Sequence, residues 1–353
     1  MKVLFIGLGS IGQRHLRNLR QLYGETMEVS AYRVKGLSRT FNDRLDILEG
    51  ISVEEKYNIT PYGSLQEALS IQPDIVFITN ITSRHMECAI EAAKAGCHIF
   101  LEKPVSDSMK GIDILRAEAE KNRVKIFIGY QYRYHICLLK LKEYLAQGFL
   151  GKIISVEAEM GERIDGMHAY EDYKDTYMAR KDMGGGVILN QQVHELDYLQ
   201  WLFGRPESVY AMSGCNSSFC LDVEDYCRAL YSISVSGKRI PVSVHADFVQ
   251  SPPVRRCKVV GDLARIEADL LNHVLYIYRN RERTEIIRFP EFKRNQMFLD
   301  ELKDFIEGIR LDKEPSISLE EGVVSLKMAL GAKLSGMTGR KVELSYDKNS
   351  LSV

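Results

Sequence analysis

The sequence opens with an apolar segment that runs straight into a glycine pattern. Residues 3 to 12 read VLFIGLGSIG, so a strand-like run ends at Gly7-x-Gly9-x-x-Gly12 and a helical pattern follows at once. In such a strand–turn–helix the first glycine allows a tight turn, the second lets the backbone approach a pyrophosphate, and the third lets strand and helix pack closely. The alternative is a glycine-rich turn that binds nothing. Because the motif follows a strand and opens a helix, whose first N–H groups can bind phosphate, we predict a dinucleotide site made by Gly7, Gly9, Ser10, Ile11 and Gly12.

Strands and helices alternate over the first 130 residues. Strands are expected at residues 2–8, 27–33, 74–79, 97–103 and 124–130, with helices at 11–23, 83–95 and 107–122. Near-continuous apolar strands of this kind are buried on both faces, as in a parallel sheet covered by crossover helices. The pattern predicts a doubly wound, Rossmann-like α/β domain over residues 1–128.

The second part of the chain has a different pattern. Strands are expected at residues 153–160, 208–212, 226–235, 240–247, 255–260, 264–268, 274–279 and 284–288. Few helices separate them; those expected lie at about 186–203, 296–309 and 319–337. Successive strands without crossover helices favour an antiparallel sheet. We therefore predict an α+β domain with a large, mostly antiparallel open sheet over residues 129–353, with the junction near Gly129.

Composition excludes some classes of partner. Lys and Arg number 47 and Asp and Glu 48, a net charge of -1, which argues against nucleic acid as the main partner. The chain begins as a strand and has no long apolar run, so we expect no membrane segment. Its seven cysteines form no CxxC pair, and its eight histidines show no zinc-like spacing. These features favour reduced thiols, a cytoplasmic location and no metal.

Two segments carry candidate proton-transfer groups. Glu102-Lys103-Pro104 ends a strand of the parallel sheet, where ligands of such sheets bind, and alternation points Glu102 and Lys103 to opposite faces. Lys103 can exchange a proton with a substrate hydroxyl; the alternative is a solvated lysine at a strand end.

The second segment begins at three glycines, 184–186. Helical spacing places Asn190, His194 and Asp197 on one stripe, beside an apolar stripe of Leu189, Val193 and Leu196. His194 can serve as a proton relay whose imidazole Asp197 orients. The alternative is a core histidine with a satisfied hydrogen bond.

The end of the second strand bears on the choice of cofactor. NAD enzymes usually have Asp or Glu there to accept from the ribose 2′-hydroxyl. This chain instead has Tyr32 and Arg33, followed by Lys35, Ser38 and Arg39. Arginine suits a 2′-phosphate, so NADP(H) is the expected cofactor and NAD(H) is possible. The alternative is a solvated basic turn beside a permissive NAD site.

Together these segments resemble the Gfo/Idh/MocA oxidoreductases, the glucose–fructose oxidoreductase and inositol dehydrogenase type. The resemblance covers nearly the whole chain and rests on GLGSIGQRHLRNL, TNITSRHMECAIEAAKAGCHIFLEKPVS, GYQYRYHICLLKLKEYLAQGFLGKI, the Gly-Gly-Gly-to-His helix and LKMALGAKLSGMTGRKVEL. It implies a Rossmann domain followed by an open-sheet domain, with nicotinamide and substrate meeting between them. It also implies hydride transfer at a hydroxyl-bearing carbon of a sugar, cyclitol, sialic-acid-type or nucleotide-sugar substrate.

The resemblance assigns roles to individual residues. Lys103 and His194 correspond to the catalytic lysine and histidine. The positions that it places at the cofactor are Thr79, Asn80, His85, Glu102 and Lys103, and those near the substrate are Gln131, Arg133 and Tyr134. Tyr177, Asn190 and Gln191 extend this polar row, which suits a hydroxyl-rich ligand.

One position departs from the family pattern. Many relatives carry aspartate at Asn190, and asparagine cannot support an imidazolium electrostatically. Lys103 is therefore expected to take the main acid–base role.

Two other functions stay open. One is a dinucleotide-binding sensor or regulator without turnover; the other is a reductase of a non-sugar substrate on the same fold. The exposed face of an open sheet also favours a homodimer or homotetramer.

Overall fold

The computed structural model describes residues 1–33, 39–42, 46–168, 170–279 and 282–346. The chain divides into unit 1, Met1–Tyr130 with Phe298–Gly322, and unit 2, Gln131–Met297 with Val323–Val353. The predicted junction lies two residues before this division. The return of a segment near the C-terminus to unit 1 differs from the prediction, which assigned everything after residue 128 to the second domain.

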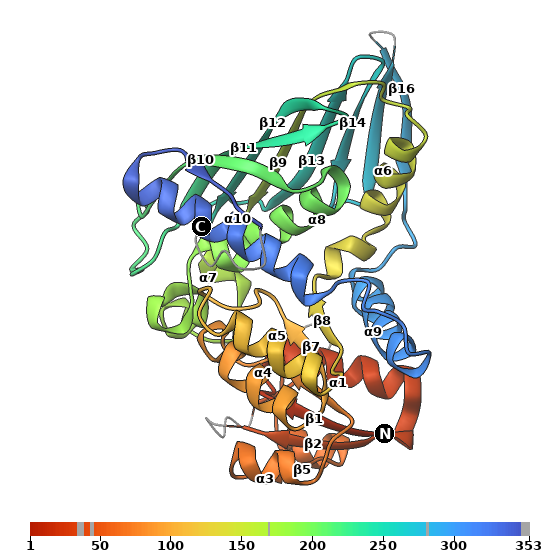
Figure 1. Cartoon of the computed structure of the whole chain (residues 1–353), viewed down its shortest axis with the longest axis vertical. Helices are drawn as coiled ribbons and strands as arrows, with labels where there is room; N and C mark the ends of the chain where they lie inside the picture. Colours follow the sequence, from red (N-terminus) through yellow and green to blue (C-terminus); the bar gives the residue numbers. More distant parts are fainter. Residues whose placement is uncertain (34–38, 43–45, 169, 280–281, 347–353) are drawn as a thin grey trace. The chain divides into compact units, whose positions relative to one another are not determined.

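Unit 1 contains a six-stranded sheet in which every neighbouring pair is parallel (Figure 1). Its order is β5-β2-β1-β6-β7-β8, with β5 Thr60–Tyr62, β2 Glu28–Tyr32, β1 Lys2–Ile6, β6 Ile75–Ile78, β7 His98–Glu102 and β8 Ile126–Gly129. Counted along the chain this is the 3-2-1-4-5-6 order of a Rossmann domain. The order in which strands are added to the sheet reverses between β1 and β6, and such a switch point is where these sheets bind ligands.

The crossover helices follow the sequence pattern only in part. Unit 1 contains α1 Ser10–Tyr23, α2 Val53–Tyr57, α3 Leu65–Ser70, α4 His85–Lys94, α5 Ile112–Lys121 and most of α9 Arg294–Arg310. The short elements β5, α2 and α3 fall in a stretch whose pattern predicted nothing regular. Each has at most six residues, which is too short to display a period.

A row of phenylalanines explains why the late segment belongs to unit 1. Phe5, Phe77, Phe100 and Phe127 lie opposite one another in β1, β6, β7 and β8. Their ring centroids are 4.7, 5.0 and 5.5 Å apart along the row. Phe305 of α9 packs its ring against this row, 5.4 Å from Phe100. Aromatic pairs in this range bury large apolar areas, so α9 covers the sheet of unit 1.

Unit 2 is built on a nine-stranded sheet of order β16-β15-β14-β13-β9-β12-β11-β10-β17 (Figure 1). The strands are β9 Ile153–Gly161, β10 Pro206–Gly214, β11 Tyr226–Val235, β12 Lys238–Asp247, β13 Val254–Gly261, β14 Ala264–Asp269, β15 Val274–Arg279, β16 Glu282–Arg288 and β17 Val342–Glu343. All neighbours are antiparallel except β9 and β12. The predicted fold class, a Rossmann domain followed by a mostly antiparallel sheet, is confirmed.

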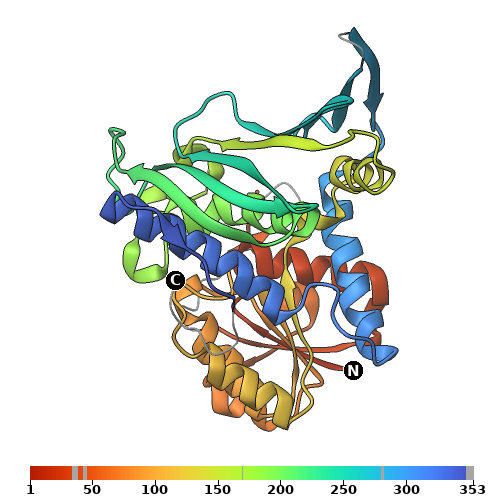
Figure 2. The ribbon, with the colours of Figure 1, turned by 45° about the horizontal axis from the view of Figure 1, so that its top comes forward.

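Helices cover one face of this sheet. They include α6 Ile136–Ala146, α8 Val193–Phe203 and most of α10 Leu319–Thr338; the short helix α7 Ile164–Met167 follows β9. The Tyr231 hydroxyl of β11 donates to the Met328 carbonyl of α10 at 3.0 Å, and α10 runs along β10 and β11 (Figure 2). Helix α6 was not predicted, although its buried Cys137, Leu138 and Leu141 have helical spacing.

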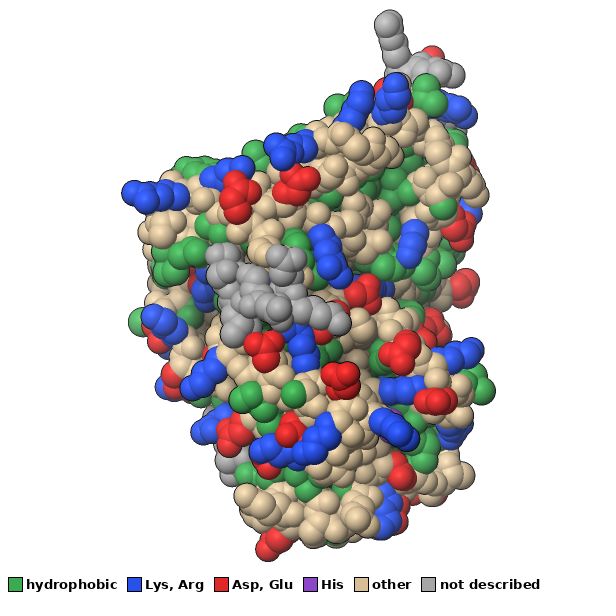
Figure 3. All heavy atoms as spheres, viewed as in Figure 1, with side chains coloured by type: hydrophobic (Ala, Val, Ile, Leu, Met, Phe, Trp, Pro, Cys, Tyr) green, Lys and Arg blue, Asp and Glu red, His purple; other side chains and the backbone are tan. Residues whose placement is uncertain are grey.

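The surface shows mixed charge. On the face drawn in Figure 3, basic and acidic side chains of the described residues are interspersed rather than gathered in one basic area. Within the described ranges, no helix has the length and hydropathy to cross a bilayer. Nor are three or more His, Cys, Asp or Glu side chains of those ranges grouped to hold a metal ion.

Candidate active-site residues

The glycine loop between β1 and α1 is closed by the end of β6. The Gly7 N–H donates to the Tyr32 carbonyl at 3.0 Å, and Thr79 Oγ1 donates to the Gly7 carbonyl at 2.6 Å. A Cβ at Gly7 would stand 2.9 Å from the Asn80 backbone, and one at Gly12 2.7 Å from Thr79 Oγ1. Thr79 and Asn80 therefore meet the glycine loop, and Gly7 and Gly12 are needed for close packing.

The same loop fits a pyrophosphate. A Cβ at Gly9 would meet nothing within 4 Å, so the loop leaves space at the position where the backbone approaches a ligand. Gly9 is the N-cap of α1 and provides no side-chain cap for the N–H groups of Ser10, Ile11 and Gly12. Uncapped first-turn N–H groups and the helix dipole suit an anion. The residues present thus match a dinucleotide.

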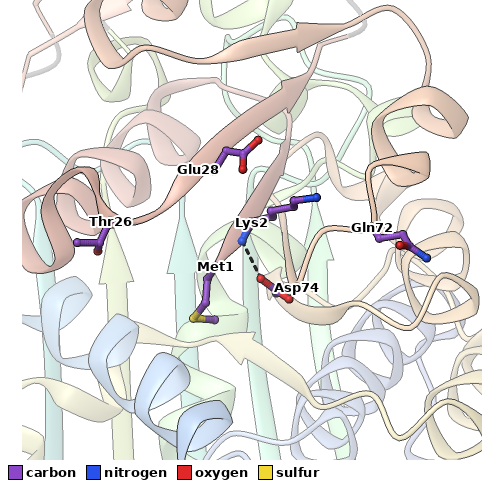
Figure 4. Close-up of a pocket in the computed structure, with 6 residues that line it drawn as sticks. All are labelled: Met1, Lys2, Thr26, Glu28, Gln72 and Asp74. Carbon is purple, nitrogen blue, oxygen red and sulfur yellow. Dashed lines mark hydrogen bonds between the residues drawn. The ribbon is translucent and has the colours of Figure 1, made fainter.

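A surface depression of about 490 Å³ lies elsewhere on unit 1 (Figure 4). Its lining residues are Met1, Lys2, Thr26, Glu28, Gln72 and Asp74, at the amino ends of β1 and β2. Ligands of parallel sheets bind at the carboxyl ends. This depression is therefore not the dinucleotide site.

Lys103 follows β7, and its backbone is held by a buried carboxylate. Glu102 Oε1 lies 2.7 Å from Nε2 of the buried His15, and Glu102 Oε2 accepts from the Lys103 N–H at 3.2 Å. The carboxylate thus supports the backbone at the end of β7, and its contact with the cofactor stays a prediction. No local spacing points to His15, because its partner Glu102 lies 87 residues away.

His85 also has a supporting position. Its ring is buried, with Nδ1 2.8 Å from the Pro104 carbonyl and Nε2 3.1 Å from the Asn80 carbonyl. Burial lowers the pKa of His85, so the neutral imidazole donates to one of the two carbonyls. His85 thus connects the ends of β6 and β7, and its contact with the cofactor stays a prediction.

Arg33 is engaged in an ion pair. Its Nη1 donates to Glu54 Oε1 of α2, a residue that the sequence pattern did not single out. Lys35 and Ser38, which the prediction grouped with Arg33, lie outside the described residues. The positive charge of Arg33 is therefore paired with the carboxylate of Glu54.

In unit 2 the three glycines shape the segment that leads to His194. Gly184 and Gly186 have φ of +79° and +104°, and a Cβ at Gly185 would stand 2.5 Å from the Tyr177 carbonyl oxygen. A Cβ at Gly186 would meet the Glu224 carboxylate at 2.2 Å. Glu224 Oε1 in turn accepts from the Ile188 N–H at 3.3 Å. The glycines thus let a carboxylate cap this segment.

The segment is not uniformly α-helical. Ile188–Gln192 is a π-helical turn, and α8 starts only at Val193. A π turn bonds residues five apart, so the predicted stripe of Asn190, His194 and Asp197 does not follow regular α spacing. Such turns occur frequently at functional sites, and His194 lies directly after this one.

A charged cluster adjoins His194. The Tyr132 ring meets the buried His194 ring edge-on, with centroids 5.2 Å apart. Arg255 donates to the Tyr132 hydroxyl and to Gln191 Oε1, and its Nε lies 3.0 Å from the buried Glu195. Sequence reasoning missed Tyr132, Glu195 and Arg255; only their polarity next to predicted site residues could have pointed to them.

Arg133 and Asp197 bind each other. Two bonds of 2.8 Å join the guanidinium to the carboxylate, and both side chains are buried. Helical spacing did not predict this pair. That Asp197 orients His194 and that Arg133 lies near the substrate stay predictions. The remaining predicted substrate residues are all in unit 2, with Gln131 and Asn190 buried and Tyr134, Tyr177 and Gln191 half-buried.

These features define a class of protein: an oxidoreductase with an NAD-binding Rossmann domain, the description that matches residues 1–130. Residues 138–267 match the GFO/IDH/MocA C-terminal domain. The chain therefore belongs to the Gfo/Idh/MocA oxidoreductase family, as its resemblance indicated.

Full-length relatives support this assignment. The chain is 26% identical to a myo-inositol 2-dehydrogenase of Thermotoga maritima, over 98% of each chain. It is 24% identical to a scyllo-inositol 2-dehydrogenase (NAD(+)) of Bacillus subtilis, over 97% of this chain and 96% of the relative. A levoglucosan dehydrogenase solved with NADH and levoglucosan shares the fold, with a TM-score of 0.81 and 16% identity over 98% of this chain and 99% of the other.

Proposed function

We propose that the protein catalyses the reversible oxidation of a secondary hydroxyl on a cyclitol or sugar, with a nicotinamide dinucleotide as hydride acceptor. The observation that carries the proposal is the glycine loop at the switch point of unit 1, together with Lys103 at the carboxyl end of the same sheet. When bound, the nicotinamide supplies the hydride chemistry. The protein then has to hold the substrate and move one proton.

Lys103 and His194 are the residues proposed to move that proton. The Glu102 carboxylate holds the Lys103 backbone, which limits the positions open to its amine. His194 follows the π turn and packs against Tyr132, so its imidazole is likewise fixed. In oxidation one of these groups accepts the hydroxyl proton as hydride leaves the same carbon; in reduction it returns the proton.

The substrate class is proposed from the relatives. The two full-length relatives named above are inositol dehydrogenases, so inositols are the first candidates. A turnover screen should compare inositols, neutral sugars, sialic acids and nucleotide sugars, with the absorbance of reduced nicotinamide as the readout. Binding of the dinucleotide without turnover of any of them would favour a sensor.

Site variants test the chemical roles. Lys103→Met should lower kcat by about 10²–10⁴-fold, the usual contribution of a general acid–base group, while nicotinamide binding stays. His194→Asn should also lower kcat, by a smaller factor. Lys94→Ala is a matched control, because Lys94 forms a surface pair with Glu91 on α4. Normal turnover by Lys103→Met on the identified substrate would contradict the assignment.

A further inference from the structure

The Arg33–Glu54 ion pair lies at the end of β2, beside the glycine loop. The Tyr32 carbonyl accepts from the Gly7 N–H. Arg33 directly follows Tyr32 at the end of β2, so its backbone lies close to the first glycine of the loop. Glu54 comes from the first turn of α2, which Ser52 caps. The pair therefore joins two elements at the place where a Rossmann domain binds the adenosine ribose.

The ion pair changes which charged groups at the end of β2 are available to bind a ribose. Dinucleotide sites specific for NAD use a carboxylate that accepts from the 2′-hydroxyl, and sites for NADP use arginine for the 2′-phosphate. Here β2 ends without an acid, yet Glu54 brings a carboxylate to the same position. About a quarter of the Glu54 side chain, 24%, is exposed, against 13% for Arg33. The Glu54 side chain is thus the more exposed member of the pair.

The charges favour the unphosphorylated ribose. A 2′-phosphate would add negative charge beside Glu54, and like charges at contact distance repel. It would also have to compete with Glu54 for the Arg33 guanidinium. A 2′-hydroxyl, in contrast, can donate to the carboxylate and leave the ion pair intact.

We propose that Glu54 is a specificity-determining residue that supplies the ribose-binding carboxylate and, by holding Arg33, selects NAD(H) over NADP(H). This inference rests on the proposed dinucleotide function. It opposes the NADP(H) preference that Arg33 predicts when it is considered alone.

Cofactor affinities test the proposal without any substrate. The dissociation constants of NADH and NADPH are measured from nicotinamide fluorescence for the wild type, Glu54→Gln, Arg33→Gln and the double variant. Glu55→Gln is the matched control: it removes the same charge one residue further along α2. Because glutamine also serves in capping boxes, the cap that Glu55 forms with Ser52 is retained.

The wild type should bind NADH more tightly than NADPH. Glu54→Gln should shift the ratio of the two constants toward NADPH by about tenfold, since it frees Arg33 for a charge-assisted bond. The double variant should lose that gain, and Arg33→Gln alone should weaken NADPH further while NADH changes little. Glu55→Gln should leave the ratio unchanged.

Three results would overturn the inference alone: tighter NADPH binding by the wild type, an unchanged ratio in Glu54→Gln, or equal shifts in Glu54→Gln and Glu55→Gln. Failure of the folded wild type to bind either nucleotide would contradict the proposed function itself. Circular dichroism checks that each variant is folded. If Glu54→Gln does not fold, Arg33→Gln still tests the inference through its effect on NADPH binding.

Discussion

At the scale of the residue, the buried contact between His15 and Glu102 connects stability to the site. His15→Ala would leave the Glu102 carboxylate buried without the group that lies 2.7 Å from it. Leaving a buried acceptor without its hydrogen-bond partner costs about 1–3 kcal/mol of unfolding free energy, which chemical denaturation measures. His15→Gln, which keeps a donor, should recover part of the loss. Equal stabilities of His15→Ala and the wild type would show that the contact contributes nothing.

The sequence revealed the residues with intrinsic chemistry but not the contacts that decide their roles. Lys103 and His194 stand out because each follows a structural signal, a strand end or a glycine triplet. Glu102, His85 and Arg133 look equally functional, yet each is held by a distant partner; Asp197 lies 64 residues from Arg133. Pairings over such distances depend on the tertiary fold, and spacing cannot predict them.

At the scale of the element, the turn before α8 depends on Gly186. Alanine at this position would adopt a φ of +104° and place its Cβ against the Glu224 carboxylate. The backbone strain alone costs about 1–3 kcal/mol, and displacement of Glu224 should also disturb the π turn before His194. Gly186→Ala should therefore lower both the melting temperature and kcat.

Gly166→Ala is the matched control for that substitution. Gly166 lies in α7 of the same unit, and a Cβ there would meet nothing within 4 Å. This variant should keep wild-type stability and turnover. If Gly186→Ala and Gly166→Ala have the same melting temperature and the same kcat, the predicted clash with Glu224 does not affect the turn before α8.

The end of β12 gives unit 2 an acid-sensitive element. Burial opposes ionisation of Asp247, but hydrogen bonds from His245, Gln250 and the Val249 N–H outweigh it and lower its pKa to about 2. An unfolded aspartate has a pKa of about 3.9. The stabilisation is therefore complete above about pH 4 and is lost as the pH falls toward 2. Unfolding of Asp247→Asn by urea should depend less on pH in this window than unfolding of the wild type; parallel curves would contradict the role.

At the scale of the whole molecule, the sequence predicted both sheets but not where the late helical segment belongs. The helical spacing of apolar residues in α9 predicts an apolar face. That spacing does not indicate which of the two sheets the face covers. The answer lies in Phe305, whose partners Phe77, Phe100 and Phe127 come from three strands far earlier in the chain. Domains assigned from the order of segments along the chain therefore miss the late segment that belongs to unit 1.

The open sheet of unit 2 carries the last prediction, that the protein forms a homo-oligomer through the face not covered by helices. Tyr210 and Met212 alternate with the inward Ala211, and Leu230 lies opposite Tyr210. These three side chains are 47%, 63% and 51% exposed. Neighbouring exposed apolar side chains on adjacent strands favour burial against a second copy.

Light scattering after size-exclusion chromatography measures the oligomeric state. Leu230→Glu would place a charge in the centre of that surface and should shift the protein toward monomers. Leu263→Glu is the control, because Leu263 is 57% exposed in the turn between β13 and β14. A wild type that is monomeric at all concentrations would contradict the prediction. An oligomer that survives Leu230→Glu would mean that the copies meet through another surface, leaving this face of the sheet open to water.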